Sequence, residues 1–469
     1  MPTQDVHTLI LGTGPAGLAA AHGLVRAGIC PVLLEKGNAV GGYMRSITRG
    51  EFILDIGRKE LYSRIPEVNH LWAELLGADY RPYLHLVGIL YDGHILASSR
   101  ADQGMRRGMP WGMLLACSLD YFWGLMKPVA SQPHNYEAYW YRKRGRHFSR
   151  ILSQGFEEKF YCRKWAEMPP VDEFSGTGLT TLQAVKNQVL HALRKAAPEQ
   201  TWRHPAKGTG QLCELLAQQI LAGRGRIQYE AQITEIVTSP GRINAVRANI
   251  GSERVTYKPL HVVSSLPLEQ LARLLLPEAA MVEDKNPRVI TAPRRSTVLV
   301  YLFFDEPPRF PHAYLNVTCP KMRAGRITNY AAFNGDMVPK GKTCLCIEFF
   351  CWETDALLAM NPEELSDLAL KECSKARLVE PTKCFDDLVI KLPGADAATN
   401  WHDWLTDTRL YYLTGLKKFG NLYNVQQPGT DKSTYAGLQA AATILSSDRT
   451  SFDHRTDPTQ EEAWKTMVT

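Results

Sequence analysis

The sequence predicts an α/β fold in which a parallel sheet built from βαβ units alternates along the chain with a second region of α+β type. An apolar run over 6–11 leads through a glycine-rich turn to a helical stretch of small residues over 18–27 and a second apolar run over 29–34. A similar strand and helix pattern resumes after residue 205. Two later runs, rich in β-branched and aromatic residues, predict an antiparallel sheet; they cover 297–304 and 343–351.

The glycine turn has the spacing of a dinucleotide-binding motif. Gly12 permits a tight turn, Gly14 lets a pyrophosphate approach the backbone, and Gly17 lets the helix lie close to the strand. The helix N-terminus offers free N–H groups and a partial positive charge to phosphates. Glu35 ends the second apolar run at about the expected ~20-residue offset, where its carboxylate accepts hydrogen bonds from ribose hydroxyls. This acid favours a nucleotide site over a βαβ unit whose glycines serve packing alone. The predicted phosphate contacts are Gly12, Gly14, Pro15, Ala16 and Gly17.

A second glycine loop indicates which dinucleotide binds. Lys36 is followed by Gly41, Gly42, Tyr43 and Arg45. The glycine pair predicts another close backbone approach, with an ordinary turn as the alternative, and Arg45 brings a cation to a phosphate. With this loop the chain resembles the flavoprotein superfamily of FAD-dependent amine oxidases and protoporphyrinogen oxidase, in which a strand-end acid is followed by two glycines and an arginine. The resemblance implies FAD as the cofactor, with these five residues among its ligands.

The elements that follow are indicated by local patterns. A strand over 52–57 ends at a glycine, and a helix over 66–77 has apolar residues at helical spacing and stops at another glycine. Apolar runs over 85–91 and 94–97 are joined by an Asp-Gly pair, which predicts a hairpin. The chain then becomes helical and tryptophan-rich over 105–200.

The second half repeats strand and helix signals. A glycine-containing turn at 207–212 opens a helix to 222, and strands are expected over 226–229 and 231–236. Paired strands are expected over 246–255, and a buried strand over 261–267. A helix is expected over 361–375, followed by a turn-rich link over 393–404. The last predicted strand covers 410–415, and the last predicted helix begins near residue 431 and ends near 445.

The resemblance implies a discontinuous division of the chain. A Rossmann-like FAD-binding domain with a parallel βαβ sheet would comprise residues 1–83, 205–290 and 395–447. An interleaved α+β substrate domain, with an antiparallel sheet above the flavin and a helical insertion, would comprise 84–204 and 291–394. A polar C-terminal tail would follow at 448–469. Within the insertion, a basic helix precedes Phe156–Tyr161, an order that resembles the UDP-galactopyranose-mutase-like branch; a helix with alternating solvated charges is the alternative.

The resemblance also implies further FAD contacts. Gly57 would lie beside the flavin ring, Ile233 at the adenine, and Gly415 at the end of the last predicted strand. The last helix would direct its N-terminus at the flavin pyrimidine ring, where it stabilises the negative charge of reduced flavin. Its contacts would be Asp431, Ser433 and Thr434, with Asp431 or Ser433 capping it. Gln426 and Gln427, rather than a cysteine, precede this helix, so non-covalent FAD is expected.

The motifs on the reaction side depart from those of the mutase-like branch. Relatives there carry Gly-Gly-His where this chain has Gly57 and Arg58-Lys59-Glu60, and Gly-Arg where it has Gly415-Leu416. The proposed residues at the reacting face are Arg58 and Lys59, which follow the flavin-contacting strand, and Tyr423, in the predicted loop after Gly415. A surface position is the alternative for Lys59.

These observations predict an FAD-dependent oxidoreductase. It would remove a hydride from a C–N or C–C bond of a small-molecule substrate, and dioxygen or another acceptor would reoxidise the flavin. A non-redox flavin-dependent isomerase of the sugar-nucleotide mutase type is the alternative, and a flavin-binding protein without catalysis is a third possibility. The altered motifs count against the isomerase.

Composition sets limits on partners and location. The net charge of +6 is too small to indicate nucleic-acid binding, and the basic stretch 141–146 is interpreted as a solvated helix end rather than an anion or membrane patch. The ten cysteines have no metal-like spacing, so no metal site is expected. The first strand begins at Val6 and leaves no room for a targeting segment, so free thiols in the cytoplasm are expected. The most apolar stretch, 109–126, predicts a substrate-domain helix, with a monotopic membrane helix as the alternative; membrane association is not expected.

Overall fold

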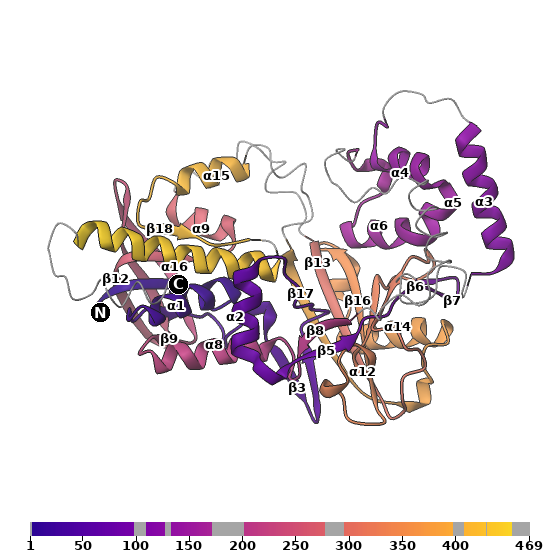
Figure 1. The fold of residues 1–469 in the computed structure, drawn as a ribbon, viewed down its shortest axis with the longest axis horizontal. Coiled ribbons are helices and arrows are strands. Elements are labelled where there is room, and N and C mark those ends of the chain that lie inside the picture. Colours follow the sequence, from indigo (N-terminus) through magenta and orange to yellow (C-terminus); the bar gives the residue numbers. More distant parts are fainter. Residues whose placement is uncertain are drawn as a thin grey trace.

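Two sheets lie beside each other in the computed structural model (Figure 1). The structure describes residues 2–97, 109–126, 133–170, 201–276, 295–396, 408–427 and 429–452. Within these residues, one seven-stranded sheet has the order β10-β11-β12-β1-β2-β9 with β18 against β12, and is called the first sheet here. The second sheet has seven strands in the order β17-β13-β16-β15-β14-β6-β7. The α/β fold class predicted from the sequence is confirmed.

The first sheet has a parallel centre. β1 (Thr3–Leu11) pairs in parallel with β2 (Val32–Leu34) and β12 (Glu253–Ser264), and β2 pairs with β9 (Arg226–Gln228). Central parallel strands are covered on both faces, which is why they are continuous apolar runs. The remaining strands are β10 (Ala231–Ser239), β11 (Arg242–Ile250) and β18 (Leu422–Asn424).

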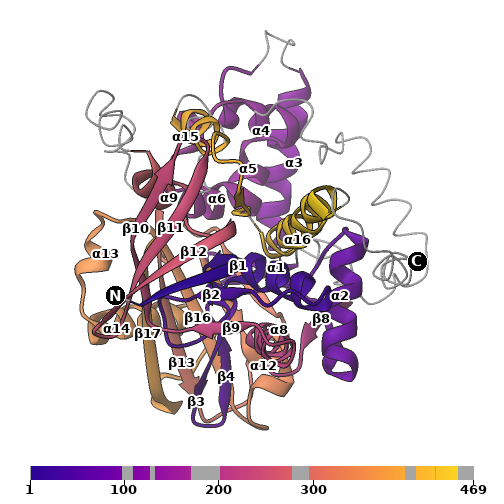
Figure 2. The ribbon, with the colours of Figure 1, turned by 90° about the vertical axis from the view of Figure 1, so that its left-hand side faces the viewer.

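Helices cover both faces of the first sheet. One face packs against α1 (Pro15–Arg26), α2 (Pro66–Leu76), α8 (Gly210–Ala222) and α16 (Thr430–Phe452). The other face packs against α9 (Leu268–Leu275) and α15 (Thr408–Leu416). Figure 2 shows α1 and α16 side by side on the sheet. Their close crossing requires glycine, because a Cβ at Gly437 would lie 2.1 Å from the Ala16 carbonyl oxygen.

The second sheet is mainly antiparallel, as its sequence predicts. Its long central strands are β13 (Arg295–Phe304) and β16 (Thr343–Trp352), which are buried along almost their whole length. One face of these strands packs against α14 (Pro362–Lys375). The other face packs against α12 (Tyr330–Phe333) and against segments from the first-sheet side of the molecule. The predicted hairpin joins β6 and β7 through Asp92 and Gly93, both with positive φ. The other strands are β6 (Val87–Tyr91), β7 (His94–Ala97), β14 (Tyr314–Val317), β15 (Arg326–Asn329) and β17 (Cys384–Asp396).

Two short ribbons connect the halves. β3 (Ser46–Arg49) pairs with β4 (Phe52–Asp55), and β5 (Tyr80–Leu84) pairs with β8 (Thr201–Pro205). The short helical turns of the described chain are η1 (Gly42–Met44), η2 (Gly77–Asp79), η4 (Trp165–Glu167), η5 (Gly335–Met337), η6 (Pro381–Lys383), α13 (Ala356–Ala359) and the π-helical η3 (Arg150–Gln154).

A helical layer stands beyond the second sheet (Figure 1). Its helices are α3 (Trp111–Met126), α4 (Tyr136–Arg144), α5 (Arg146–Ser149) and α6 (Gly155–Tyr161). Part of the predicted insertion, residues 171–200, lies outside the described residues. α3 faces α5 through Cys117 and Asp120, and on its other side exposes a row of large apolar side chains: Trp111, Leu115, Leu119, Phe122 and Trp123. Among the helices that the structure describes, none has the length and apolarity to cross a membrane. The monotopic alternative for α3 stays a prediction.

Four local predictions are wrong. Residues 410–415 form helix α15 rather than a strand, because Tyr412 and Leu416, four residues apart, pack together against the α9 side of the sheet. The last strand of the first sheet is β18, so Tyr423 lies in a strand rather than in a loop.

The other two errors concern where elements end. Residues 393–396 complete β17 instead of starting a link, and the proline is tolerated because β17 is an edge strand. The remainder of that link, 397–404, lies outside the described residues. α16 continues past residue 445 to Phe452, because Asp448 contacts His7 and His261 of the first sheet. Residues 453–469 of the predicted tail are also outside the described part.

Candidate functional site: a nucleotide cradle and a buried charge cluster

The first glycine loop leaves open space at one position only. A Cβ at Gly12, which has φ +98°, would lie 2.4 Å from Ser265 Oγ, and a Cβ at Gly17 would lie 2.1 Å from the Gly12 carbonyl oxygen. Nothing lies within 4 Å of the Cβ position at Gly14. Pro15 and Ala16 follow directly as the first residues of α1. Gly12 and Gly17 therefore serve packing, and Gly14 provides the gap through which a pyrophosphate can reach the helix N-terminus.

Glu35 is held at the end of β2 by the same loop. One carboxylate oxygen, Oε2, accepts hydrogen bonds from the backbone N–H and the hydroxyl of Thr13, and Oε1 accepts one from the Gly37 N–H at 2.8 Å. Lys36 beside it is exposed. This carboxylate is oriented by backbone donors beside the first glycine loop, which is the position that a ribose-binding acid requires.

The second glycine loop faces the first. Gly41 and Gly42 form the start of η1 with φ of +99° and +54°, and the Gly41 N–H donates to the Thr13 carbonyl at 2.8 Å. A Cβ at Gly42 would lie 3.8 Å from Gly14 Cα. Tyr43 and Arg45 are exposed on the same turn. We call the two loops together with Glu35 the nucleotide cradle.

The first turn of α16 lies against the cradle. Thr430 Oγ1 is 3.3 Å from Met44 Sδ of η1, and Thr434 is buried with its hydroxyl donating to the Thr430 carbonyl. Ser433 donates its hydroxyl to the Gln427 carbonyl at 2.7 Å, so it contacts the preceding loop rather than a helix N–H. Asp431 lies in the same turn. The α16 N-terminus therefore lies beside the second glycine loop.

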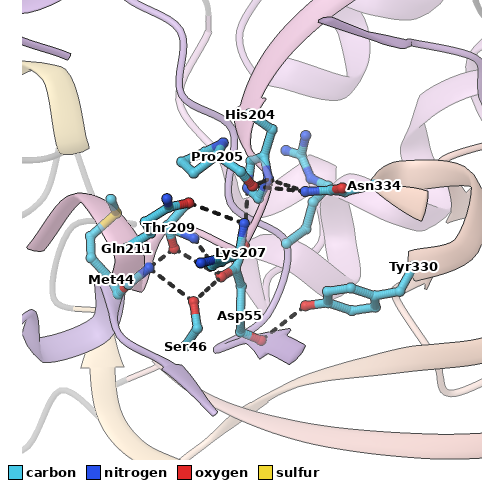
Figure 3. Close-up of polar contacts among 12 residues, drawn as sticks. Met44, Ser46, Asp55, His204, Pro205, Lys207, Thr209, Gln211, Tyr330 and Asn334 are labelled. Atoms are coloured by element: carbon cyan, nitrogen blue, oxygen red, sulfur yellow. Dashed lines mark hydrogen bonds and ion pairs between the residues drawn. The ribbon is translucent and has the colours of Figure 1, made fainter. Parts of the chain in front are cut away.

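A buried carboxylate, Asp55, connects the cradle to the second sheet (Figure 3). Asp55 Oδ1 accepts hydrogen bonds from Ser46 Oγ at 2.7 Å and from Thr209 N and Oγ1 at 2.8 and 3.0 Å. The Thr209 hydroxyl also lies 2.9 Å from the Met44 carbonyl oxygen of η1. His204 Nε2 lies 3.1 Å from Asp55 Oδ2, and both side chains are fully buried.

No motif in the sequence singles out Asp55, His204 or Thr209. Asn334 Nδ2 lies 2.9 Å from His204 Nδ1 and donates to the Pro205 carbonyl, so residues from β4, β8, the start of α8 and the α12 end meet at this point (Figure 3). The only local signal was the acid near the end of the 52–57 strand, since the partners lie far away in the chain.

Gly57 is fixed by two tyrosines of the other half. The Tyr301 hydroxyl accepts from the Gly57 N–H at 2.9 Å and donates to the Asp55 carbonyl at 2.6 Å. The Tyr330 hydroxyl lies 2.9 Å from the same carbonyl and 3.2 Å from the Gly57 carbonyl. Gly57 has φ +70°, and its Cβ position is 3.4 Å from Leu299 Cδ2 of β13. The loop that leaves the cradle side is therefore held directly against the second sheet.

Arg58, the next residue, enters a buried group of charges. Its guanidinium pairs with Glu60 and lies 4.3 Å above the Tyr314 ring, and its backbone N–H donates to Glu348 Oε1 at 3.3 Å. Two further partners complete the group: His85 Nε2 lies 3.2 Å from Glu60, and Arg326 pairs with Glu348 at 3.0 Å. We call this the Arg58 cluster: Arg58, Glu60, His85, Tyr314, Arg326 and Glu348.

Burial and pairing set the charge states in the Arg58 cluster. Burial alone would raise the pKa of Glu60, but the hydrogen bond from His85 and the charge of Arg58 outweigh it and lower the pKa to about 2. Burial works to lower the pKa of Arg58, and the charge of Glu60 reverses this, so that pKa is raised. For Arg326, burial dominates over Glu348 and the pKa is lowered. Near neutral pH Glu60 is therefore an anion beside the Arg58 guanidinium and the His85 ring.

The structure separates the predicted reacting residues. Arg58 lies in the cluster and Lys59 is half-buried beside it in the chain. The Tyr423 hydroxyl instead lies 3.3 Å from His261 Nδ1 in the first sheet, and among the described contacts it does not touch the Arg58 cluster.

Gly415 is inside α15, where its Cβ position is 2.7 Å from Leu276 Cδ1, so its predicted place at a strand end is wrong. Ile233 lies half-buried in β10, paired with Ala248.

Comparison with known proteins supports the architecture. The family model of the NAD(P)-binding Rossmann-like domain matches residues 10–75. No curated protein matches this chain by sequence.

Solved structures match over nearly all of the chain. Reduced UDP-galactopyranose mutase has a TM-score of 0.71 at 16% identity, covering 94% of this chain and 96% of that one. A putative protoporphyrinogen oxidase from Exiguobacterium sp. 255-15 has a TM-score of 0.68 at 16% identity, covering 94% and 98%. Putrescine oxidase bound to putrescine has a TM-score of 0.59 at 12% identity, covering 95% and 100%. The resemblance predicted from the sequence is therefore confirmed in the fold: the protein shares the two-sheet architecture of these structures, built on a Rossmann-like unit.

Proposed function

We propose that this protein binds FAD non-covalently and oxidises a small molecule by removing a hydride from a C–N or C–C bond. The observation that carries the proposal is the nucleotide cradle. Open space at Gly14, a second glycine loop bonded to the first through the Gly41 N–H and the Thr13 carbonyl, and an oriented carboxylate at Glu35 fit the pyrophosphate and ribose of a dinucleotide. The second loop favours FAD over NAD, and likeness to enzymes named as protoporphyrinogen and putrescine oxidases supports oxidation.

Each part of the chain would have a distinct role toward FAD. The α1 and α16 N-termini and Arg45 would hold the phosphates and the flavin pyrimidine edge, and Gly57 would meet the flavin ring. When bound, FAD supplies the hydride-accepting group. The proposed FAD contacts, with Gly415 now left out, are Gly12, Gly14, Pro15, Ala16, Gly17, Glu35, Lys36, Gly41, Gly42, Tyr43, Arg45, Gly57, Ile233, Asp431, Ser433 and Thr434.

The Arg58 cluster would face the substrate. Arg58 Nε is buried without a hydrogen-bond partner among the described residues, so it is a donor available to a substrate acceptor group. Glu60, with its pKa near 2, stays ionised and orients Arg58 and His85 rather than supplying a proton. Such a site positions and desolvates a substrate, which is what hydride removal by a cofactor requires from the protein.

Likeness to UDP-galactopyranose mutase keeps an isomerase as the second candidate. Leu416 belongs to α15 and does not follow a strand, so the replacement of Gly-Arg by Gly415-Leu416 no longer counts against the isomerase. The charge cluster supplies a different argument. Arg58 and Arg326 are each paired with a glutamate, so a sugar diphosphate would have to displace these carboxylates, of which Glu348 is buried, to reach them. Oxidation therefore remains the preferred function.

Purified protein should be yellow and release its flavin on heating or acidification. Anaerobic mixing of the oxidised protein with candidate amines or polycyclic substrates should abolish the visible flavin band, and an electron acceptor should restore it. Turnover only after reduction with dithionite, with a product of the same mass as the substrate, would establish the isomerase instead. Flavin that stays with the precipitated chain would contradict non-covalent binding.

Substitutions rank the three proposed reacting residues. Arg58→Lys keeps the charge but loses the fork of N–H donors, and we expect flavin reduction to slow by about 10–100-fold, corresponding to ~1.5–3 kcal/mol. Lys59→Ala should have a smaller effect, and Tyr423→Phe the smallest, since its hydroxyl contacts His261. Wild-type reduction rates in all three variants would refute the whole set.

A further inference from the structure

Three side chains with metal-binding chemistry meet at the first sheet, outside the cradle and the Arg58 cluster. His7 comes from β1, His261 from β12 and Asp448 from α16. The two imidazole rings have centroids 5.5 Å apart. Asp448 lies between them, with Oδ2 at 3.1 Å from His7 Nε2 and Oδ1 at 3.0 Å from His261 Nε2. One nitrogen of each ring and one carboxylate oxygen all lie within 4.8 Å of one another.

The other ring nitrogens already have partners of the kind that support metal ligands. His7 Nδ1 lies 2.9 Å from Thr8 Oγ1, and His261 Nδ1 lies 3.3 Å from the Tyr423 hydroxyl. A histidine ligand commonly donates its second N–H to such a group, which fixes the tautomer and directs the free lone pair at the metal. Here the hydroxyls can accept from both Nδ1–H groups, and both Nε2 atoms then face the carboxylate.

We propose that His7, His261 and Asp448 bind a divalent transition-metal ion, for which zinc is the best match. Two neutral imidazoles and a carboxylate form a typical three-ligand set, and a water completes a tetrahedron. Zinc bonds of about 2.0–2.1 Å place ligand atoms roughly 3.3 Å apart, so the side chains would have to close from their present spacing by up to about 1.5 Å. All three are partly exposed, at 32%, 14% and 25% of the side chain, which allows this adjustment and leaves access for the ion.

The proposed ion has a structural role. Asp448 is 18 residues beyond Thr430, the first residue of α16, so the site is about 27 Å along the helix from the cradle. It would fasten the C-terminal part of α16 to two central strands of the first sheet, one of which, β1, leads into the first glycine loop. No spacing along the chain signals it, because the ligands are 187 residues or more apart.

Zinc titration of untagged, chelator-treated holoprotein tests the proposal. We expect calorimetry to detect one zinc ion per chain and the melting temperature to rise with added zinc. Asp448→Asn and His7→Gln should weaken zinc binding by more than 100-fold, and Thr8→Val, which removes only the supporting hydroxyl, by about 10–100-fold. His94→Gln changes an exposed histidine on β7 and is the matched control, with unchanged binding.

Two results would overturn the proposal. One is a folded wild-type protein, verified by circular dichroism, that binds no zinc ion stoichiometrically. The other is stoichiometric binding that persists unchanged in Asp448→Asn and Thr8→Val, because the ion would then lie elsewhere. In either case the three residues form only a hydrogen-bonded imidazole–carboxylate–imidazole link. The flavin spectrum serves as a separate readout, since failure of the zinc proposal leaves the proposed FAD site unaffected.

Discussion

The nucleotide cradle and the Arg58 cluster lie on either side of Gly57, but they are assembled in opposite ways. The cradle is local: Thr13 and Glu35, which bond within it, are 22 residues apart. The Arg58 cluster is distant: Arg58 and Glu348 are 290 residues apart. Glycines shape the cradle by leaving space, whereas paired charges fill the cluster. A site made of backbone geometry leaves a contiguous motif in the sequence, and a site made of converging side chains does not.

The junction between the two regions should show the largest effect. Asp55→Asn removes the negative charge that accepts the buried donors of Ser46 and Thr209. If the amide oxygen keeps these bonds, the N–H₂ group takes the place of Oδ2 beside His204 Nε2. We expect the free energy of unfolding to fall by about 3–5 kcal/mol in urea titrations, with loss of bound flavin. Ser46→Ala removes one donor and should cost only about 1 kcal/mol. Equal losses in the two variants would show that Asp55 does not hold the regions together.

Two glycines of the cradle should separate packing from binding. Gly17→Ala forces a Cβ to 2.1 Å from a backbone oxygen, so we expect about 3 kcal/mol of destabilisation or more in thermal unfolding. Gly14→Ala puts a methyl group into open space and should leave the stability of the flavin-free protein unchanged while weakening FAD binding. Normal FAD affinity in Gly14→Ala would place the pyrophosphate somewhere else.

The Arg58 cluster should make stability depend on pH. The pKa of Glu60 falls from its ordinary 4.5 to about 2 on folding, so the unfolded chain binds more protons between these values and stability decreases as pH falls through this window. The contribution above pH 4.5 is at most about 3 kcal/mol. Glu60→Gln should be less stable at pH 6 and should lose less stability than the wild type between pH 4.5 and 2. Parallel stability curves for the two proteins would contradict this account.

The smallest effect is expected at the ribose position. Glu35→Ala removes a charged acceptor, and we expect FAD binding to weaken by ~1.5–3 kcal/mol, measured by flavin fluorescence during titration. The fold should survive, since Glu35 is only half-buried at the end of β2. Unchanged FAD affinity would exclude Glu35 as the ribose ligand.

Local chemistry was sufficient to predict the parts of the molecule in which neighbours in sequence interact. The glycine loops, the strand-end acid and the Asp92–Gly93 hairpin depend on backbone conformations that few residues adopt. The helix over 361–375 is another case, since Asn361 caps α14 and exchanges hydrogen bonds with Glu364 three residues later.

Only the tertiary structure decided the rest. The apolar stretch 410–415 is too short for its period to distinguish a strand from a helix, and packing against the α9 side of the sheet selects the helix. The same applies to side chains that meet across the chain, such as Asp55 with Thr209, Arg58 with Glu348, and His7 with Asp448. Sequence alone determined the two glycine loops and the strand-end Glu35, because their information is in the backbone of one short segment. The reacting side and the proposed metal site depend on which distant strands become neighbours, and no local pattern specifies that.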